Sequence, residues 1–239
     1  MADLPKHERV LQVFQSISFS YDKANSRISL GMEKRWKRLL TDTLLSRVED
    51  GGSVLDVCSG TGDIAIALAG RRPDLKVVGL DFSTAMLEVA KEKGSGFPNV
   101  AWKKGDAMHL PFPDGTFSAA CISFGLRNTS DYARVLGEMT RVIQPGGWVY
   151  CLDSFVPDSL LIRPVYEFYF KVMMPLLGGG FHHHQEYMWL FESTQKFLRK
   201  DQLLALFQRT GLEKAGFESR MFGACVLHQG QKPRKPLIE

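Results

Sequence analysis

The stretch Val54-Leu-Asp-Val-Cys-Ser-Gly-Thr-Gly-Asp63 decides how the rest of this chain is interpreted. It joins a short apolar run to a glycine-rich turn, and a helical pattern begins directly after the turn. Small residues in the turn let the backbone approach a ligand, and the unpaired N–H groups at a helix start can hold polar ligand atoms. The stretch therefore predicts a strand, a ligand-binding loop and a helix in succession, the opening unit of an α/β sheet.

Beyond this loop, short apolar runs continue to alternate with helical patterns. We expect strands over residues 53–57, 77–81, 100–104, 119–124, 148–153, 213–220 and 224–229. We expect helices over 63–69, 85–93, 132–143 and 199–210, with Pro145-Gly146-Gly147 ending the third and turning the chain into the next strand. The nearly continuous apolar character of the first five strands is typical of parallel strands covered on both faces. The fold class is therefore α/β, a doubly wound and mostly parallel seven-stranded sheet.

Length and composition fit one large α/β domain. The chain has 239 residues, of which 44% are hydrophobic and 23% charged, and these values exclude a disordered chain and a coiled coil. Four dispersed cysteines exclude a disulfide scaffold. The charged N-terminus and the lack of an apolar run of about 18 residues predict a cytoplasmic protein without a membrane span. The net charge of +4 permits attraction to an anionic surface but does not require one.

We expect residues 1–239 to form a single domain with four parts. These are an N-terminal helical lid (1–45), a cofactor-binding core (46–155), a substrate-side insertion (156–198), and a C-terminal helix with closing strands (199–239). The apolar segment 160–177 fits a channel for an apolar tail and a core helix equally well. The basic residues Lys34, Arg35, Lys37 and Arg38 fit a solvated helix face better than a contact with anionic lipid headgroups.

Two classes of cofactor fit the glycine loop. Gly60-x-Gly62, with Asp81 about 20 residues further on, also matches a loose dinucleotide fingerprint. However, Asp56 and Asp63 flank the turn, and a pyrophosphate ~5 Å from either would be repelled by ~3 kcal/mol even at an effective dielectric constant of about 20. S-adenosylmethionine has no phosphate and carries an ammonium and a sulfonium, so these carboxylates suit it better. The alternative for Asp63 is a helix-start residue that only complements the helix dipole.

Further polar residues follow the next strands of the predicted sheet. Asp81 ends the second strand, where a carboxylate can take both ribose hydroxyls. Asp106 and Ala107 follow the third strand and can meet the adenine amine, and Ser123 lies in the fourth. Because the ends of parallel strands face one crevice in an open α/β sheet, we expect these residues to form a single site with Gly60 and the rest of the loop.

Several longer motifs resemble those of the C-methyltransferases of ubiquinone and menaquinone biosynthesis, over nearly the whole chain. They are Phe14-x6-Tyr21-Asp-x-Ala-Asn25, Ser29-Leu-Gly31, Arg35-Trp-Lys-Arg38, residues 55–63, Gly105-Asp-Ala107, residues 110–117, Ile122-Ser-Phe-Gly-Leu-Arg-Asn128 and residues 142–147. The stretch 122–128 is the most discriminating of them. The resemblance implies a Rossmann-like class I methyltransferase that depends on S-adenosylmethionine. It also implies a reduced polyprenyl quinol substrate, with conversion of demethylmenaquinol to menaquinol as the expected reaction.

The resemblance also implies roles for individual residues. The family's cofactor contacts fall on Thr61, Asp81, the Asp106-Ala107 pair and Ser123, and the match favours Tyr21 as a cofactor contact from the lid. The stretch after Gly178, which contains His182–His184, departs from the family pattern.

Methyl transfer to a ring carbon needs an electron-rich ring. A phenol has a pKa near ~10, so the site requires a base or a positive group that lowers this pKa. We expect Arg127 to stabilise the phenolate and Asn128 to hold a ring oxygen, and Asp153 and His109 are the candidate bases. The alternative for Arg127 is a structural ion pair with a helix carboxylate.

The sequence also indicates which other ligands and partners to expect. We expect no metal, since the adjacent side chains of His182–His184 diverge and no second cluster lies at ligand spacing. We expect no nucleic acid, because the chain has no concentrated basic stripe. A lipid-soluble quinol is the expected partner. A homodimer, peripheral association with the inner membrane face, another small or lipid substrate, and an NAD-linked oxidoreductase stay open.

Overall fold

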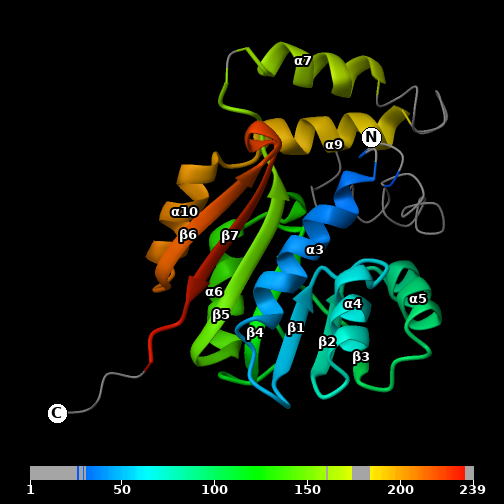
Figure 1. Cartoon of the computed structure of the whole chain (residues 1–239), viewed down its shortest axis with the longest axis vertical. Helices are drawn as coiled ribbons and strands as arrows, with labels where there is room; N and C mark the ends of the chain where they lie inside the picture. The colour runs from blue at the N-terminus through cyan, green and yellow to red at the C-terminus, as the bar shows by residue number, and fades with distance from the viewer. Residues whose placement is uncertain (1–25, 27–28, 30, 160, 174–183, 235–239) are drawn as a thin grey trace.

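The computed structural model describes residues 26, 29, 31–159, 161–173 and 184–234. Its strands are β1 (Ser53–Val57), β2 (Lys76–Asp81), β3 (Val100–Lys104), β4 (Phe117–Ser123), β5 (Ile143–Ser154), β6 (Glu213–Arg220) and β7 (Cys225–Gln231). They form one sheet in the order β3-β2-β1-β4-β5-β7-β6 (Figure 1). The pairs among β1 to β5 are parallel, and β7 runs antiparallel to both of its neighbours. The predicted mostly parallel seven-stranded sheet is confirmed.

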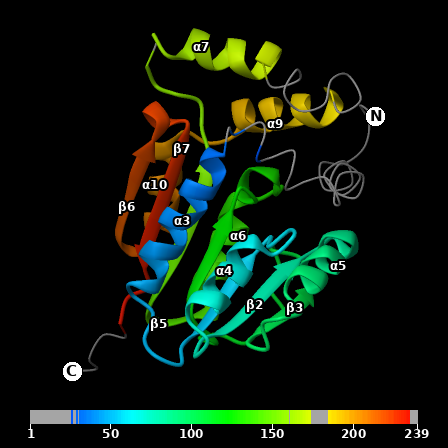
Figure 2. The same cartoon turned by 45° about the vertical axis from the view of Figure 1, so that its right-hand side comes forward.

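Helices cover both faces of this sheet. The described helices are α3 (Met32–Leu45), α4 (Asp63–Arg71), α5 (Thr84–Lys93), α6 (Tyr132–Val142), α7 (Arg163–Phe168), α9 (His184–Lys196) and α10 (Lys200–Arg209). Helices α3, α4 and α5 lie on one face, and α6 and α10 lie on the other (Figures 1 and 2). The sheet is therefore the middle layer of three.

The alternation of side chains along each strand supplies a core to both faces. Val54 lies in the same hydrophobic cluster as side chains of α3 and α4, whereas the next residue, Leu55, lies in the cluster that contains side chains of α6 and α10. On α6, the apolar side chains of Leu136 and Met139 are completely buried against the sheet. Each such side chain stabilises the fold by about 1.5–3 kcal/mol relative to exposure. This two-sided burial explains why the strands of the sequence are almost continuously apolar.

The structure corrects the expected turn at Pro145-Gly146-Gly147. Helix α6 already ends at Val142, and β5 begins at the next residue. Ile143 pairs with Phe117 of β4, and the register shifts before the neighbouring strands pair again further along. The three residues therefore form an irregularity within β5. Gly146 takes a φ of 84°, which side chains rarely adopt.

A third group of elements lies over the carboxyl ends of the strands. Helix α7, the π-helical turn Tyr169–Met173 and α9 lie above the sheet in both views (Figures 1 and 2). Within 161–173, the core-helix interpretation of the apolar segment is wrong, because Val165 and Phe168 are 65% and 57% exposed. None of the described helices is long and apolar enough to cross a membrane. Residues 1–25 lie outside the described residues, so the lid over 1–45 stays a prediction.

Candidate active site

The strand order reverses between β1 and β4, and two cavities lie at this point, where open α/β sheets bind their ligands. The smaller has a volume of about 100 Å³ and collects residues from four strand ends. Its lining includes Gly60, Asp81, Asp106, Ala107, Ser123 and Asn128. The structure therefore brings together most of the residues that the sequence analysis singled out.

The two glycines of the loop have different surroundings. Gly60 lines both cavities with a φ of 54°, and a Cβ atom there would meet nothing within 4 Å. Gly62 lines neither cavity; a Cβ atom there would lie 2.4 Å from the ring of Trp102. Gly62 therefore permits packing at the start of α4, and only Gly60 faces open space.

Asp81 ties the glycine loop to the end of β2. Its Oδ2 accepts the N–H of Gly60 at 2.8 Å, and its Oδ1 accepts the N–H of Ser83 at 2.9 Å. Burial raises the pKa of this carboxyl group. Each carboxylate oxygen has two acceptor sites, so both oxygens keep capacity for a ligand in the cavity.

The other two strand ends are polar and differ in exposure. Asp106 has a half-exposed side chain, and its Oδ1 accepts the N–H of Met108 at 2.9 Å. The hydroxyl of Ser123 is buried, and within the described residues it has no hydrogen-bond partner. A buried hydroxyl without a partner costs free energy, so a polar ligand atom in the cavity would find an available hydrogen-bonding group here.

Two residues beside the loop hold unusual backbone conformations. Cys58 and Phe124 both have a φ of 55°, which residues other than glycine seldom adopt, and both line the two cavities. Such strain costs about 1–3 kcal/mol per residue and is concentrated at functional sites. Cys58 lies in the turn that follows β1.

The larger cavity has a volume of about 400 Å³ and shares Cys58, Gly60, Ser123 and Phe124 with the smaller one. Thr61 and Arg127 line it on the side of the sheet. Its other wall is mostly apolar and comes from the α7 region and from the turn between β6 and β7. A polar site at the strand ends thus continues into a space suited to an apolar group.

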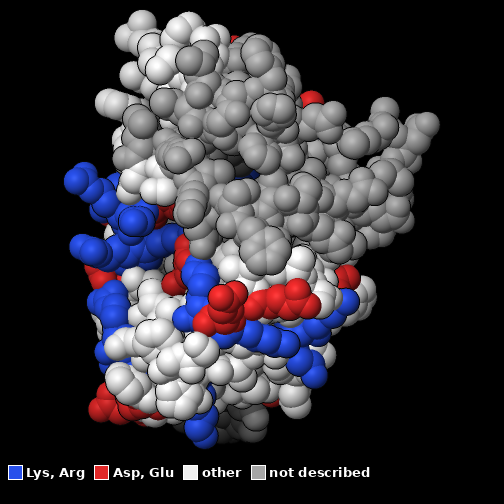
Figure 3. All heavy atoms as spheres, turned by 90° about the vertical axis from the view of Figure 1, so that its right-hand side faces the viewer, with Lys and Arg blue, Asp and Glu red and all other residues white. Residues whose placement is uncertain are grey.

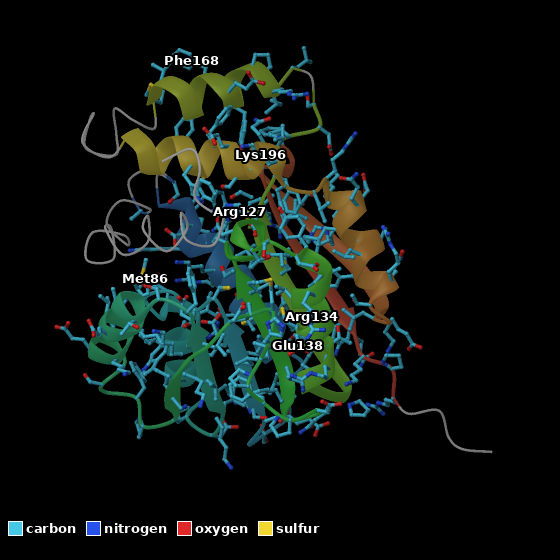
Figure 4. The ribbon with its side chains drawn as sticks, turned by 180° about the vertical axis from the view of Figure 1, so that it is seen from behind. Met86, Arg127, Arg134, Glu138, Phe168 and Lys196 are labelled. Atoms are coloured by element: carbon cyan, nitrogen blue, oxygen red, sulfur yellow. The ribbon has the colours of Figure 1, made fainter. Side chains whose placement is uncertain are left out.

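Arg127 lies beyond β4 in a short 3-10 turn, Leu126–Asn128, below α9 (Figure 4). Its guanidinium forms a buried ion pair with Asp153 of β5, and the backbone N–H of Arg127 donates to Asp153 Oδ2 at 3.3 Å. The structural ion pair considered above therefore exists, but the carboxylate belongs to a strand. Asp153 is completely buried by these contacts, which argues against it as the base. His109, the other candidate, is largely exposed and lines neither cavity.

The amide of Asn128 is held from two sides. Its Nδ2 donates to the carbonyl oxygen of Phe124 at 3.3 Å, and its Oδ1 accepts the indole N–H of Trp189 at 3.2 Å. Trp189 belongs to α9, and no role for it was predicted from the sequence. The only signal was that residues 181–190 depart from the family pattern.

The two carboxylates that flank the loop have different surroundings. Asp56 accepts the N–H of Ala65 at 3.2 Å, and burial raises its pKa to about 7. Asp63 accepts hydrogen bonds from the ammonium groups of Lys37 and Lys93. Burial raises the pKa of Asp63, but the charges of the two lysines outweigh it and the net shift is downward. The negative charge of Asp63 is therefore already paired.

Lys37 corrects the prediction of a solvated basic face. Lys34, Arg35 and Arg38 of α3 are exposed as expected, but the side chain of Lys37 is only 18% exposed and turns toward the larger cavity. Tyr21, His182 and His183 lie outside the described residues, so their predicted roles stay predictions.

The glycine loop, the acidic residues at the ends of β2 and β3, and the strand order define a class I methyltransferase that uses S-adenosylmethionine. Solved structures agree on the fold. A chain of the Haloferax volcanii complex of the Trm112 methyltransferase activator with a methyltransferase superposes with a TM-score of 0.66 at 20% identity, covering 92% of this chain and 98% of that one. Phosphoethanolamine N-methyltransferase 2 of Haemonchus contortus, solved with S-adenosyl-L-methionine, superposes with a TM-score of 0.61 at 16% identity, covering 82% of this chain and 52% of that one.

Sequence comparison identifies the family. The model of the ubiE/COQ5 methyltransferase family matches residues 2–232, and the chain belongs to that family. It is similar to the demethylmenaquinone methyltransferases of Bacillus cereus (strain AH187) and Bacillus anthracis. Identity to each is 45% over 233 residues, which cover 95% of this chain and 97% of the relative. The predicted family, enzyme class and cofactor are confirmed.

Proposed function

We propose that this enzyme methylates a ring carbon of a reduced polyprenyl quinol, with demethylmenaquinol as substrate and menaquinol as product. The junction of the two cavities is the main support: the strand-end site that holds Asp81 and Asp106 shares four residues with the larger cavity, which has one mostly apolar wall. A quinol ring at this junction would have its apolar tail in the larger cavity. The names of the two Bacillus relatives favour the menaquinone-type ring.

The strand-end site fits the cofactor. S-adenosylmethionine supplies an electrophilic methyl group on a sulfonium. Asp81 would bind the ribose hydroxyls, Asp106 and Ala107 the adenine, and Gly60 with Thr61 the amino-acid end. The buried Ser123 hydroxyl would gain a polar partner, which it lacks within the described residues. Tyr21 would close the site from the lid, and Gly62 would shape the loop through its packing.

Arg127 and Asn128 would act on the ring oxygens. A guanidinium stays protonated, so Arg127 would stabilise the phenolate by its charge and would not accept a proton. The ion pair with Asp153 fixes the guanidinium beside the larger cavity. The contacts of the Asn128 amide with Phe124 and Trp189 restrict its rotation, so the amide would meet a ring oxygen in one orientation.

An exposed apolar surface marks where the tail would enter. The exposed large hydrophobic side chains among the described residues all come from the α7 region and the turn between β6 and β7. They are Leu161, Val165, Phe168, Val172, Met173, Met221 and Phe222. Val165, Met221 and Phe222 also line the larger cavity. In Figure 3 the described atoms at the top, where α7 lies, are mostly uncharged. Patches of this kind mark contacts with membranes or partners, and a bilayer holding the substrate fits this one.

The reaction is tested with labelled S-adenosylmethionine and a panel of reduced naphthoquinols and benzoquinols that carry polyprenyl tails. We expect label in the ring of demethylmenaquinol and none in the oxidised quinones, which lack an electron-rich carbon. Labelling of none of the quinols, or of another lipid in preference to all of them, would contradict the proposal.

Membrane association is tested by cosedimentation with vesicles of neutral and anionic lipids. We expect the triple variant Val165→Ser, Phe168→Ser, Phe222→Ser to lose binding. The matched control Lys34→Gln, Arg35→Gln, Arg38→Gln changes three exposed charges on α3 and should keep it. Loss of binding in the control alone would favour an electrostatic contact with headgroups instead. The homodimer stays a prediction, which sedimentation velocity tests.

A further inference from the structure

We infer that Lys37 and Asp63 form the subsite for the amino-acid end of the cofactor, with the Lys37 ammonium binding its carboxylate. This inference rests on the cofactor placement proposed above. It adds a residue of α3, outside the strand-end motifs, to the binding site.

The two side chains meet at the wall of the larger cavity. Lys37 is on α3 and Asp63 begins α4, and these helices lie side by side (Figures 1 and 2). Lys37 Nζ lies 2.8 Å from Asp63 Oδ2, and both residues line the cavity together with Gly60 and Thr61. The ion pair is therefore next to the loop that the cofactor must cross.

The geometry of the two cavities sets the direction of the cofactor. With the ribose at Asp81, the adenosine end lies in the smaller cavity, and Gly60 is shared by both cavities. The amino-acid end then extends into the larger cavity. Two basic residues line that cavity within the described part of the chain, and Arg127, held by Asp153, is placed above at the ring oxygens of the substrate. Lys37 is thus the cation next to the loop.

The charges around Lys37 suit a zwitterion. Glu33, Asp56 and Asp63 all line the same cavity, and Lys37 forms ion pairs with Glu33 and Asp63. An ammonium has three N–H donors, so two carboxylates leave one for a third acceptor. Burial lowers the pKa of Lys37, but the charges of Glu33 and Asp63 together raise it by more than burial lowers it. The ammonium therefore stays protonated. The surrounding carboxylates would then favour the ammonium of the same amino acid.

Lys93 provides a matched control. Its ammonium donates to the same Asp63 carboxylate and to Thr61 Oγ1 at 3.3 Å, yet Lys93 lines neither cavity. If Lys37 served only to neutralise Asp63, then Lys37→Met and Lys93→Met would have the same effect. A direct contact with the carboxylate of the ligand predicts an effect for Lys37 alone.

The test measures binding by calorimetry, with the full chain and two ligands. S-adenosylhomocysteine has the complete amino-acid end, and its decarboxylated analogue lacks only the carboxylate. We expect the wild type to prefer S-adenosylhomocysteine by about ten-fold or more, the usual effect of a hydrogen bond between charged groups. Lys37→Met should abolish this preference, whereas Lys93→Met and the charge-preserving Lys37→Arg should keep most of it.

Each other outcome has a defined meaning. The inference would be overturned if folded Lys37→Met still preferred S-adenosylhomocysteine, or if the wild type showed no preference between the two ligands. It would also be overturned if Lys93→Met lost the preference as completely as Lys37→Met. Thermal melting of each variant establishes that it folds, and Lys37→Gln is the second variant if Lys37→Met does not. Failure of the wild type to bind either ligand would instead overturn the cofactor placement on which the inference rests.

Discussion

The guanidinium of Arg127 and the carboxylate of Asp153 form an ion pair between the ends of the neighbouring strands β4 and β5, with 6% and 0% of their side chains exposed. Water is almost completely excluded from both groups. Loss of either partner would leave an uncompensated charge in the protein interior, which costs more than loss of an exposed ion pair. Stability and catalysis must therefore be measured separately at this position.

Arg127→Met should lower the free energy of unfolding by about 3–5 kcal/mol, because Asp153 would keep its burial and lose its counter-charge. The double variant Arg127→Met, Asp153→Leu should recover most of this stability, since no buried charge remains. Urea denaturation measures both effects. The folded double variant should bind S-adenosylhomocysteine like the wild type and turn over far more slowly. Loss of cofactor binding with unchanged turnover at saturation would contradict the phenolate role.

The loop glycines should respond differently to alanine. Gly62→Ala should lower the free energy of unfolding by more than about 2 kcal/mol, because the new methyl group clashes with Trp102 in addition to the positive φ of 84°. Gly60→Ala adds only backbone strain of about 1–2 kcal/mol, but its methyl group points into open space in the cavities. We expect Gly60→Ala to show the larger loss of S-adenosylhomocysteine affinity. Equal effects of the two variants on stability and binding would contradict this assignment.

Ser123→Ala should separate binding from folding. The Ser123 hydroxyl is buried and has no partner within the described residues, so its removal should change stability by less than about 0.5 kcal/mol or increase it slightly. If the cofactor supplies that partner, its affinity should fall by about five-fold. Thermal melting and calorimetry on the same sample check both effects. A stability loss above about 1 kcal/mol would show that the hydroxyl already has a structural partner.

His228 should make the protein sensitive to acid. It is completely buried, its Nε2 donates to the carbonyl oxygen of Lys200 at 2.9 Å, and burial lowers its pKa from 6.5 to about 4. Between these two values the unfolded chain binds the extra proton and the folded chain does not. Stability should therefore decrease as the pH falls from 6.5 toward 4, by about 3 kcal/mol at the lower limit.

The matched variants for this prediction are His228→Phe and His109→Gln. His228→Phe should flatten the dependence of unfolding free energy on pH between about 5 and 6.5, whatever its effect on absolute stability. His109 has a largely exposed side chain, and its replacement should leave that slope unchanged. An unchanged slope in His228→Phe would assign the acid sensitivity to other groups.

Local sequence pattern was sufficient for most of the sheet. The bounds of β1, β3 and β6 agree with the prediction, because an apolar or alternating run between turn residues is a property of neighbouring residues. The predicted start of β5, residue 148, lies five residues after its observed start at Ile143. Its first residue, Ile143, is a strand residue only because it pairs with Phe117 of β4, and that pairing is not encoded locally.

The sequence by itself determined the sheet, the glycine loop and the meeting of Asp81, Asp106 and Ser123, because parallel strands place their carboxyl ends at one edge. Only the tertiary structure decided how the charges pair. Asp153 looked like a base until Arg127 was found beside it, and Lys37 looked like its exposed neighbours on α3. Helix packing on the sheet decides which side chains of distant residues meet, and burial then decides whether a charge is free to act or is held by its partner.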